Sequence, residues 1–309
     1  MLGEFGFRIG VKYDNILNMK ETLFRVLTED NLELVGILYE PVQSSKKILV
    51  HVHGMGGNFY ENKFLDFIAQ TLTANGFAFL TFNNRGCELV KDLSKIENEK
   101  RSIVRIGGSY EIFEDSLFDI KAVIDFVESK RFTEIHLSGH SLGASKVAYY
   151  VTEQNDNRIK SIIFLSPADM VGLAKTDKYY QRDIDMAKKM IIEGRGKELM
   201  PFMIWDENYL TADTYMSIGS DKSKVAIFNF YNPIDSLSSL GKIKISSLTI
   251  MGRKDVALTI AIEDTMDRVK KAMISSSKVE TNILDDADHG YNNYEQKLAD
   301  ILKIWIQKM

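Results

Sequence analysis

Apolar and polar residues alternate along two neighbouring stretches near the start of the chain. Residues 21–28 and 32–40 carry an apolar side chain at nearly every second position, on either side of the polar residues 29–31. A period of two interrupted by a short polar turn predicts a β-hairpin with one face toward water. Residues 47–53 are more continuously apolar, which predicts a strand covered on both faces.

The rest of the chain alternates short apolar runs with amphipathic stretches. The apolar runs predict buried strands at 77–82, 135–137, 161–166, 246–251 and 279–284. Apolar residues at helical spacing predict helices at about 61–75, 109–129, 144–151 and 260–274, and a closing helix that includes Leu298 and Trp305. This alternation predicts an α/β protein with a mostly parallel sheet flanked by helices on both sides.

Two segments depart from this alternation. The charged stretch from Cys87 to Gly108 predicts an exposed loop. Residues 167–235 combine amphipathic helical pieces with six of the thirteen methionines. They predict a helical cap inserted into a core domain that is formed by residues 1–166 and 236–309.

Composition and charge narrow the class of protein. The 309 residues are 45% hydrophobic and 27% charged, as in a soluble globular protein. A net charge of −4 offers no basic surface for nucleic acid. The longest apolar runs fall far short of the roughly 18 residues of a membrane span. The first twenty residues have no apolar signal region, and the single Cys87 excludes an internal disulfide. We therefore expect a cytoplasmic protein; the oligomeric state is left open.

The stretch from Gly139 to Gly143, Gly-His-Ser-Leu-Gly, lies where a predicted strand meets a predicted helix. Glycines on both sides of Ser141 let the strand and the helix approach closely, while the serine adopts a sparsely populated backbone conformation. This arrangement is typical of a nucleophile elbow, so Ser141 is the candidate nucleophile.

A serine hydroxyl is a weak nucleophile and needs a general base within hydrogen-bonding reach. Of the five histidines, only His289 lies in a loop after a sheet strand, and it is therefore the candidate base. The others are predicted to be structural, and they are His51, His53, His136 and His140. The spacing of His51 and His53 has no carboxylate or thiol cluster nearby to complete a metal site. Neither a metal nor an organic cofactor is predicted.

The base needs an acid to orient it, and Asp255 is the candidate. It stands three residues after the predicted strand 246–251 ends at Gly252. The chain order is then serine, aspartate, histidine, as in α/β-hydrolases. Three other carboxylates remain alternatives, and they are Asp235, Asp285 and Asp286.

An oxyanion hole requires two backbone N–H groups that point to the attacked carbonyl oxygen. Leu142 follows the nucleophile and begins a helix, whose N-terminal end favours an anion. The glycine-rich residues 53–57, His-Gly-Met-Gly-Gly, follow the third predicted strand. The N–H groups of Met55 and Leu142 are therefore the predicted donors.

These motifs together resemble the α/β-hydrolase superfamily. The resemblance rests on residues 53–57, Asn-Arg-Gly at 84–86, the elbow, Gly-Arg-Lys-Asp at 252–255 and Asp-His-Gly at 288–290. It covers the chain from about residue 21 to the end except for the cap. It implies an eight-stranded, mostly parallel sheet with an antiparallel pair among its first strands, and a serine-dependent acyl-enzyme mechanism.

The resulting expectation is a serine hydrolase that cleaves a small or medium, apolar carboxylic ester. A thioesterase, an amidase, a carbon–carbon bond hydrolase or an acyltransferase with the same triad is an alternative. A non-catalytic ligand-binding protein on this scaffold is another. Flexible methionines and amphipathic aromatic rings suit an apolar acyl group, and we expect Met203, Trp205 and Tyr209 to line the substrate pocket.

Overall fold

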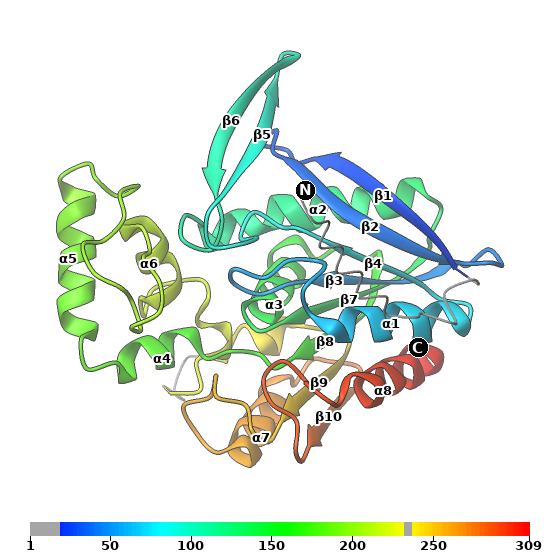
Figure 1. Cartoon of the computed structure of the whole chain (residues 1–309). Helices are drawn as coiled ribbons and strands as arrows, with labels where there is room; N and C mark the ends of the chain where they lie inside the picture. The colour runs from blue at the N-terminus through cyan, green and yellow to red at the C-terminus, as the bar shows by residue number, and fades with distance from the viewer. Residues whose placement is uncertain (1–18, 232–236) are drawn as a thin grey trace, which may run out of the picture.

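A computed structural model describes residues 19–231 and 237–309 of the chain. Within these ranges, eight strands form one sheet in the order β1-β2-β4-β3-β7-β8-β9-β10 (Figure 1). Their bounds are Met19–Leu27 (β1), Glu33–Pro41 (β2), Lys47–Val52 (β3), Ala78–Phe82 (β4), Glu134–His140 (β7), Ile159–Leu165 (β8), Ser246–Gly252 (β9) and Val279–Leu284 (β10). The strand β2 runs antiparallel to both of its neighbours, and all other neighbours are parallel. The predicted fold class is therefore confirmed.

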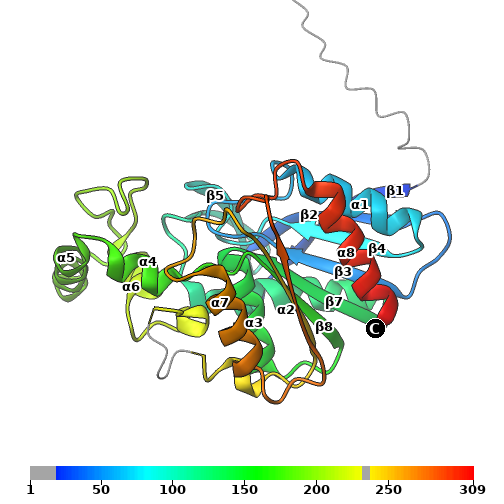
Figure 2. The same cartoon turned by 90° about the horizontal axis from the view of Figure 1, so that it is seen from below.

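Successive residues of β3 face opposite sides of the sheet and contact different helices. Leu49 packs with helices α1 (Lys63–Ala74) and α8 (Glu295–Lys308) in one hydrophobic cluster. Ile48 and Val50 belong to a second cluster. That cluster includes residues of α2 (Ser116–Ser129), α3 (Leu142–Gln154) and α7 (Ile262–Ala272). Two helical layers thus sandwich the sheet (Figure 2).

Between β8 and β9 the chain leaves the sheet and forms mainly helices. These are α4 (Met170–Thr176), α5 (Tyr180–Ile192), α6 (Ala212–Gly219) and the short 3₁₀ helices η3 (Ala226–Phe228) and η4 (Leu240–Lys242). Both views place α5 and α6 at one end of the molecule (Figures 1 and 2). The predicted cap boundary at residues 235–236 lies outside the described residues.

The prediction of a loop from Cys87 to Gly108 is wrong. The centre of this segment is a β-hairpin of β5 (Lys91–Glu97) and β6 (Lys100–Ile106). Asn98 and Glu99 both have positive φ, at 48° and 64°, as a tight two-residue hairpin turn requires. The hairpin stands out from the sheet (Figure 1). Because water reaches most of its side chains, its strands lack the apolar alternation that marks a buried strand.

The predicted helix 109–129 begins later than expected, at α2, after the 3₁₀ helix η2 (Phe113–Asp115). No helix in the described ranges has both the length and the apolar character needed to cross a bilayer.

The junction between β7 and α3 is too crowded for any side chain at two of its positions. A Cβ atom on Gly139 would lie 2.1 Å from the carbonyl oxygen of Gly143. A Cβ atom on Gly143 would lie 2.2 Å from the carbonyl oxygen of Val52, at the end of β3. The backbones of β3, β7 and α3 can therefore meet here only because both residues are glycine.

We expect Gly143→Ala to lower the free energy of unfolding by about 3 kcal/mol or more, because a backbone oxygen cannot move aside as a flexible side chain can. The matched control is Gly241→Ala, where the added Cβ would lie 3.3 Å from its nearest neighbour. It should change stability by about 1 kcal/mol or less. Urea denaturation of both variants tests the expectation, and equal stabilities would contradict it.

Candidate active site

Ser141 lies between β7 and α3 with φ 57° and ψ −126°, a backbone conformation that is rare for a residue with a side chain. Its N–H donates to Leu165 O at the end of β8 (2.9 Å). This conformation turns the chain sharply from strand to helix and leaves the Ser141 side chain lining a cavity. The expected elbow geometry is therefore present at Ser141.

Asp255 and His289 contact each other directly. The distance from His289 Nδ1 to Asp255 Oδ1 is 2.8 Å, and Asp255 Oδ1 also accepts from the Ala257 N–H (2.9 Å). Burial alone would raise the pKa of Asp255, but the hydrogen bond and the charge of His289 hold that pKa below its usual value. An ionised carboxylate at Nδ1 keeps the proton on that nitrogen and leaves His289 Nε2 as the basic site.

The alternative acids do not contact His289 in this way. Asp285 pairs with Arg253 (3.0 Å) and Asp286 with Lys254 (3.2 Å), all on the surface. Asp235 lies outside the described residues.

His140 connects the elbow to the loop that carries His289. Its Nε2–H donates to the carbonyl oxygen of His289 (2.7 Å), and the two ring centroids are 4.8 Å apart. Burial and the neighbouring imidazole of His289 lower the pKa of His140 to about 3, so His140 is a neutral donor near pH 7. The Ser141 hydroxyl has no hydrogen bond to His289 in the described chain. Such contacts are often loose before a substrate binds.

Two residues that the sequence did not indicate hold this loop from the other side. Tyr291 is fully buried, and its hydroxyl donates to Ile250 O (2.8 Å) and accepts from the Ser166 hydroxyl (2.9 Å). Tyr291 lies two residues after His289, so these bonds fix the His289 loop relative to β8 and β9. A tyrosine after Asp-His-Gly carries no local signal for such a role.

The loop of residues 53–57 lies against the elbow. A Cβ atom on Gly54 would lie 2.9 Å from Ser141 Cβ and 3.4 Å from the Leu142 nitrogen. The N–H groups of Gly56 and Gly57 donate to Gly86 O and Gly54 O. In the part of the chain that the structure describes, the N–H groups of Met55 and Leu142 have no such acceptor. Two unpaired donors are therefore close to the Ser141 side chain.

His53 holds this loop as a neutral ring. Its Nδ1–H donates to Gly54 O (2.8 Å), and its Nε2 accepts from the Asn84 N–H (3.0 Å). Burial and the charge of Lys146 lower the pKa of His53 to about 3.

Cys87 is also buried, and burial raises its thiol pKa to about 12.

Ser141 and Met55 line a cavity of about 640 Å³ beside the segment after β8. Trp205 lines it too, as expected. Met203 and Tyr209 do not belong to its lining and are 41% and 48% exposed. The remaining apolar lining comes from Leu89, Ala168, Met170, Leu173, Val256 and Ala257.

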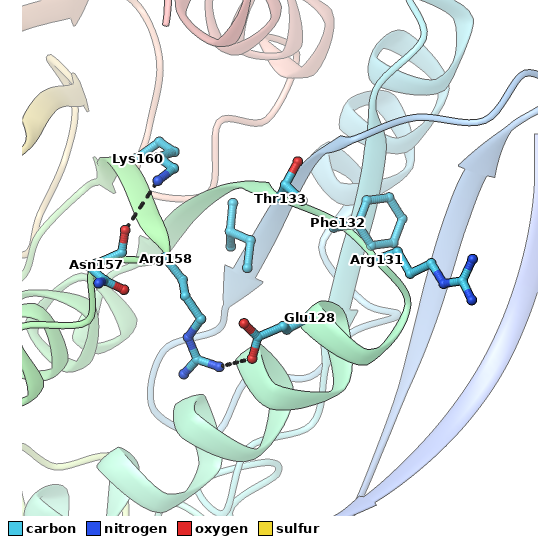
Figure 3. Close-up of a pocket in the computed structure, with 8 residues that line it drawn as sticks. Glu128, Arg131, Phe132, Thr133, Asn157, Arg158 and Lys160 are labelled. Carbon is cyan, nitrogen blue, oxygen red and sulfur yellow. Dashed lines mark hydrogen bonds and ion pairs between the residues drawn. The ribbon is translucent and has the colours of Figure 1, made fainter.

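A second cavity, of about 500 Å³, lies at the opposite edge of the sheet, where β7 and β8 begin (Figure 3). Three of its charged side chains are engaged, since Arg158 contacts Glu128 and Lys160 donates to Asn157 O. Active sites of α/β sheets lie at the carboxyl ends of the strands. The cavity that Ser141 lines is therefore the candidate active site.

The fold matches that of solved esterases. The chain is similar to Est1E from Butyrivibrio proteoclasticus with bound ferulic acid, at 19% identity over 92% of this chain and 98% of that chain, with a TM-score of 0.63. It is also similar to the Pyrococcus furiosus esterase Pf2001, at 17% identity over 93% and 92% of the two chains, with a TM-score of 0.57. The esterase domain of a Rhodothermus marinus protein matches at 16% identity over 94% and 99%, also with a TM-score of 0.57. At these identities the likeness establishes the α/β-hydrolase fold.

No curated protein sequence matches the chain significantly. A family described as "Protein of unknown function (DUF1749)" matches residues 108–307, which is more than half of the chain and includes Ser141, Asp255 and His289. The chain therefore belongs to the DUF1749 family.

Proposed function

We propose that this protein is a serine-dependent hydrolase that cleaves a small or medium, apolar carboxylic ester through an acyl-enzyme intermediate. The observation that carries the proposal is the 2.8 Å contact between Asp255 and His289, next to the elbow that holds Ser141. The esterase neighbours support the same reaction class.

In the proposed acylation step, Ser141 Oγ attacks the ester carbonyl carbon and its proton passes to His289 Nε2. Asp255 stabilises the imidazolium that forms. The N–H groups of Met55 and Leu142 bind the negative oxygen of the tetrahedral intermediate. The carbon–oxygen bond of the leaving alcohol then breaks, and His289 gives its proton to that oxygen. In deacylation, water attacks the acyl carbon while His289 takes its proton. The bond from that carbon to Ser141 Oγ then breaks, and His289 returns the proton to Ser141.

The cavity lining supports an uncharged acyl group. Met170, Leu173 and Trp205 offer an apolar wall near Ser141. Polar groups also line the cavity, and three of them are carboxylates (Asp177, Asp206 and Glu207) against a single cation (Lys178). The negative balance disfavours anionic substrates. Among the alternatives, hydrolysis of polyanionic acyl-CoA thioesters is therefore the least supported. Amide and carbon–carbon bond hydrolysis and acyl transfer would use the same nucleophile, so the labelling assay below separates catalysis only from simple ligand binding.

Ser141→Ala should abolish hydrolysis of p-nitrophenyl esters and labelling by a fluorophosphonate probe, because the nucleophile is lost. The matched control is Ser145→Ala on α3, since the Ser145 hydroxyl is fully buried and has no hydrogen-bond partner among the described residues. The control should keep both activities. Full activity in Ser141→Ala would contradict the mechanism, and failure of the unaltered protein to label would favour a binding protein.

Asp255→Asn should lower kcat by about 10⁴ and leave KM nearly unchanged, because an amide at this position favours the wrong tautomer of His289. Asp285→Asn is the control, since Asp285 pairs with Arg253 on the surface. Steady-state kinetics on a p-nitrophenyl ester measures both variants. A large loss in Asp285→Asn instead would reassign the orienting acid.

Neutral esters should exceed esters with a distal carboxylate in kcat/KM by about tenfold at low salt, and added salt should shrink the difference. The double variant Asp206→Asn/Glu207→Gln should reduce the difference in kcat/KM between the two ester classes. The same charge change at Glu193 and Glu198, outside the cavity lining, should not. Equal preference for both ester classes in the unaltered protein would show that the lining carboxylates do not select the substrate.

A further inference from the structure

An ion pair is buried behind the candidate oxyanion loop. Lys146 lies on α3, five residues after Ser141, and its ammonium contacts the Glu111 carboxylate. The two side chains are 0% and 1% exposed. Burying both charges costs desolvation free energy, and an apolar pair of similar volume is often at least as stable. Stability alone therefore does not explain why these two charges lie here.

The first connection from this pair to the loop runs through Asn84. Lys146 Nζ donates to Asn84 Oδ1 (3.1 Å), which also accepts from the Gly86 N–H (2.9 Å). The other side-chain atom, Asn84 Nδ2, donates to His53 O (3.1 Å). The Asn84 backbone N–H donates to the His53 ring (3.0 Å). Asn84 thus joins the buried ammonium to the residue that begins the loop 53–57.

The second connection runs through Gly86. The Glu111 carboxylate packs so closely on Gly86 that a Cβ atom there would lie 2.1 Å from Glu111 Oε2. The carbonyl oxygen of Gly86 accepts from the Gly56 N–H (3.0 Å), next to Met55. Each member of the ion pair is therefore connected to the loop that carries the Met55 N–H, Lys146 through Asn84 and Glu111 through Gly86.

We propose that Lys146 and Glu111 are positioning residues that hold Asn84 and Gly86, and through them orient the Met55 N–H toward the oxyanion. The inference rests on the proposed function. A hydrogen-bond donor stabilises the transition state only where its N–H points at the developing charge. The buried ion pair lies behind the loop and fixes the orientation of the Met55 N–H without contacting the substrate.

The turn that contains Asn84 and Gly86 has a separate anchor. Arg85 donates to Asp119 through its backbone N–H (2.7 Å) and through its guanidinium group (2.8 Å). Changes at Lys146 and Glu111 therefore leave the turn attached to α2, and they shift the loop without detaching it.

The central test is the double variant Lys146→Met/Glu111→Met, which replaces the ion pair by two apolar side chains of similar length. The single variant Lys146→Met leaves the Glu111 charge unpaired and should lower Tm. The double variant should recover Tm close to that of the unaltered protein. Its kcat on a p-nitrophenyl ester should nevertheless stay about a hundredfold low, with KM changed less than about threefold. Ser145→Ala serves as the control with unchanged kinetics.

A transition-state analogue separates positioning from general damage. Inhibition by a trifluoromethyl ketone, whose adduct with Ser141 carries the oxyanion, should weaken in the double variant by the same factor as kcat. Recovery of kcat together with Tm would mean that the pair is only structural, and it would overturn the inference.

Asn84→Ala provides an independent route, because it cuts the first connection while Lys146 and Glu111 stay paired. It should also lower kcat with little change in KM. The triple variant combines Asn84→Ala with both methionines. Its kcat should fall by less than the product of the factors measured for Asn84→Ala and for the double variant, since these changes act along one path. Unchanged kcat in Asn84→Ala, or losses that multiply fully, would overturn the inference.

The two proposals fail in different ways. If the unaltered protein neither hydrolyses esters nor labels with the fluorophosphonate, the proposed function is wrong and the inference falls with it. If the unaltered protein is active and the double methionine variant keeps its kcat, only the positioning role is wrong.

Discussion

The site depends on one steric constraint, the close approach of three backbone segments at the elbow. Gly54, Gly139 and Gly143 each occupy a place where a side chain would overlap the backbone or the Ser141 side chain. Because these glycines bring β3, β7 and α3 together, the serine, the loop after β3 and the start of a helix share one small volume. The geometry of the candidate site is therefore a consequence of backbone packing, and the surrounding side chains hold the backbone in the position that the glycines allow.

Most polar side chains around the elbow hold the backbone and do not face a substrate. His53 and His140 are buried, have pKa values lowered to about 3, and each donates to a backbone carbonyl oxygen. Near pH 7 both rings are neutral and keep one tautomer, so each holds the backbone that it hydrogen-bonds in a fixed position. Among the described residues, the groups near the elbow without a hydrogen-bond partner include the Ser141 hydroxyl, the Met55 and Leu142 N–H groups and His289 Nε2. These are the groups that acyl transfer needs.

The sequence predicted the parts of the molecule that follow local rules. Buried strands such as β3 and β4 are mostly apolar, and the glycine pattern around Ser141 reflects a steric need that any chain with this turn would share. Ser141, Asp255 and His289 each follow a strand, and the carboxyl ends of parallel strands lie at the same edge of the sheet. The contact between Asp255 and His289 agrees with that expectation, while their catalytic roles stay a proposal.

What the sequence did not reveal depends on distant partners or on water. The pattern of the hairpin β5–β6 predicts a loop, because its exposed strands carry charges where a half-buried strand would alternate polar with apolar residues. The burial of Lys146 cannot be seen locally, since its partner Glu111 lies 35 positions away. Trp205 lines the cavity and Met203 does not. Trp205 and Asp206 both adopt positive φ, at 55°, and a tryptophan does not signal such a backbone conformation.

The segment between β8 and β9 is also linked to the loop that follows β9. The Asp169 carboxylate accepts from the N–H groups of Gly172 in α4 and Tyr231 at the far end of the segment, and from the Thr259 hydroxyl. The Asp169 N–H donates to Ala257 O, two residues after Asp255. Asp169 therefore joins both ends of this segment to the loop that carries Asp255. If the proposed mechanism holds, a change in the segment that moves Asp169 would alter the position of Asp255 as well as the shape of the cavity. Substrate choice and reactivity would then be coupled through this one residue.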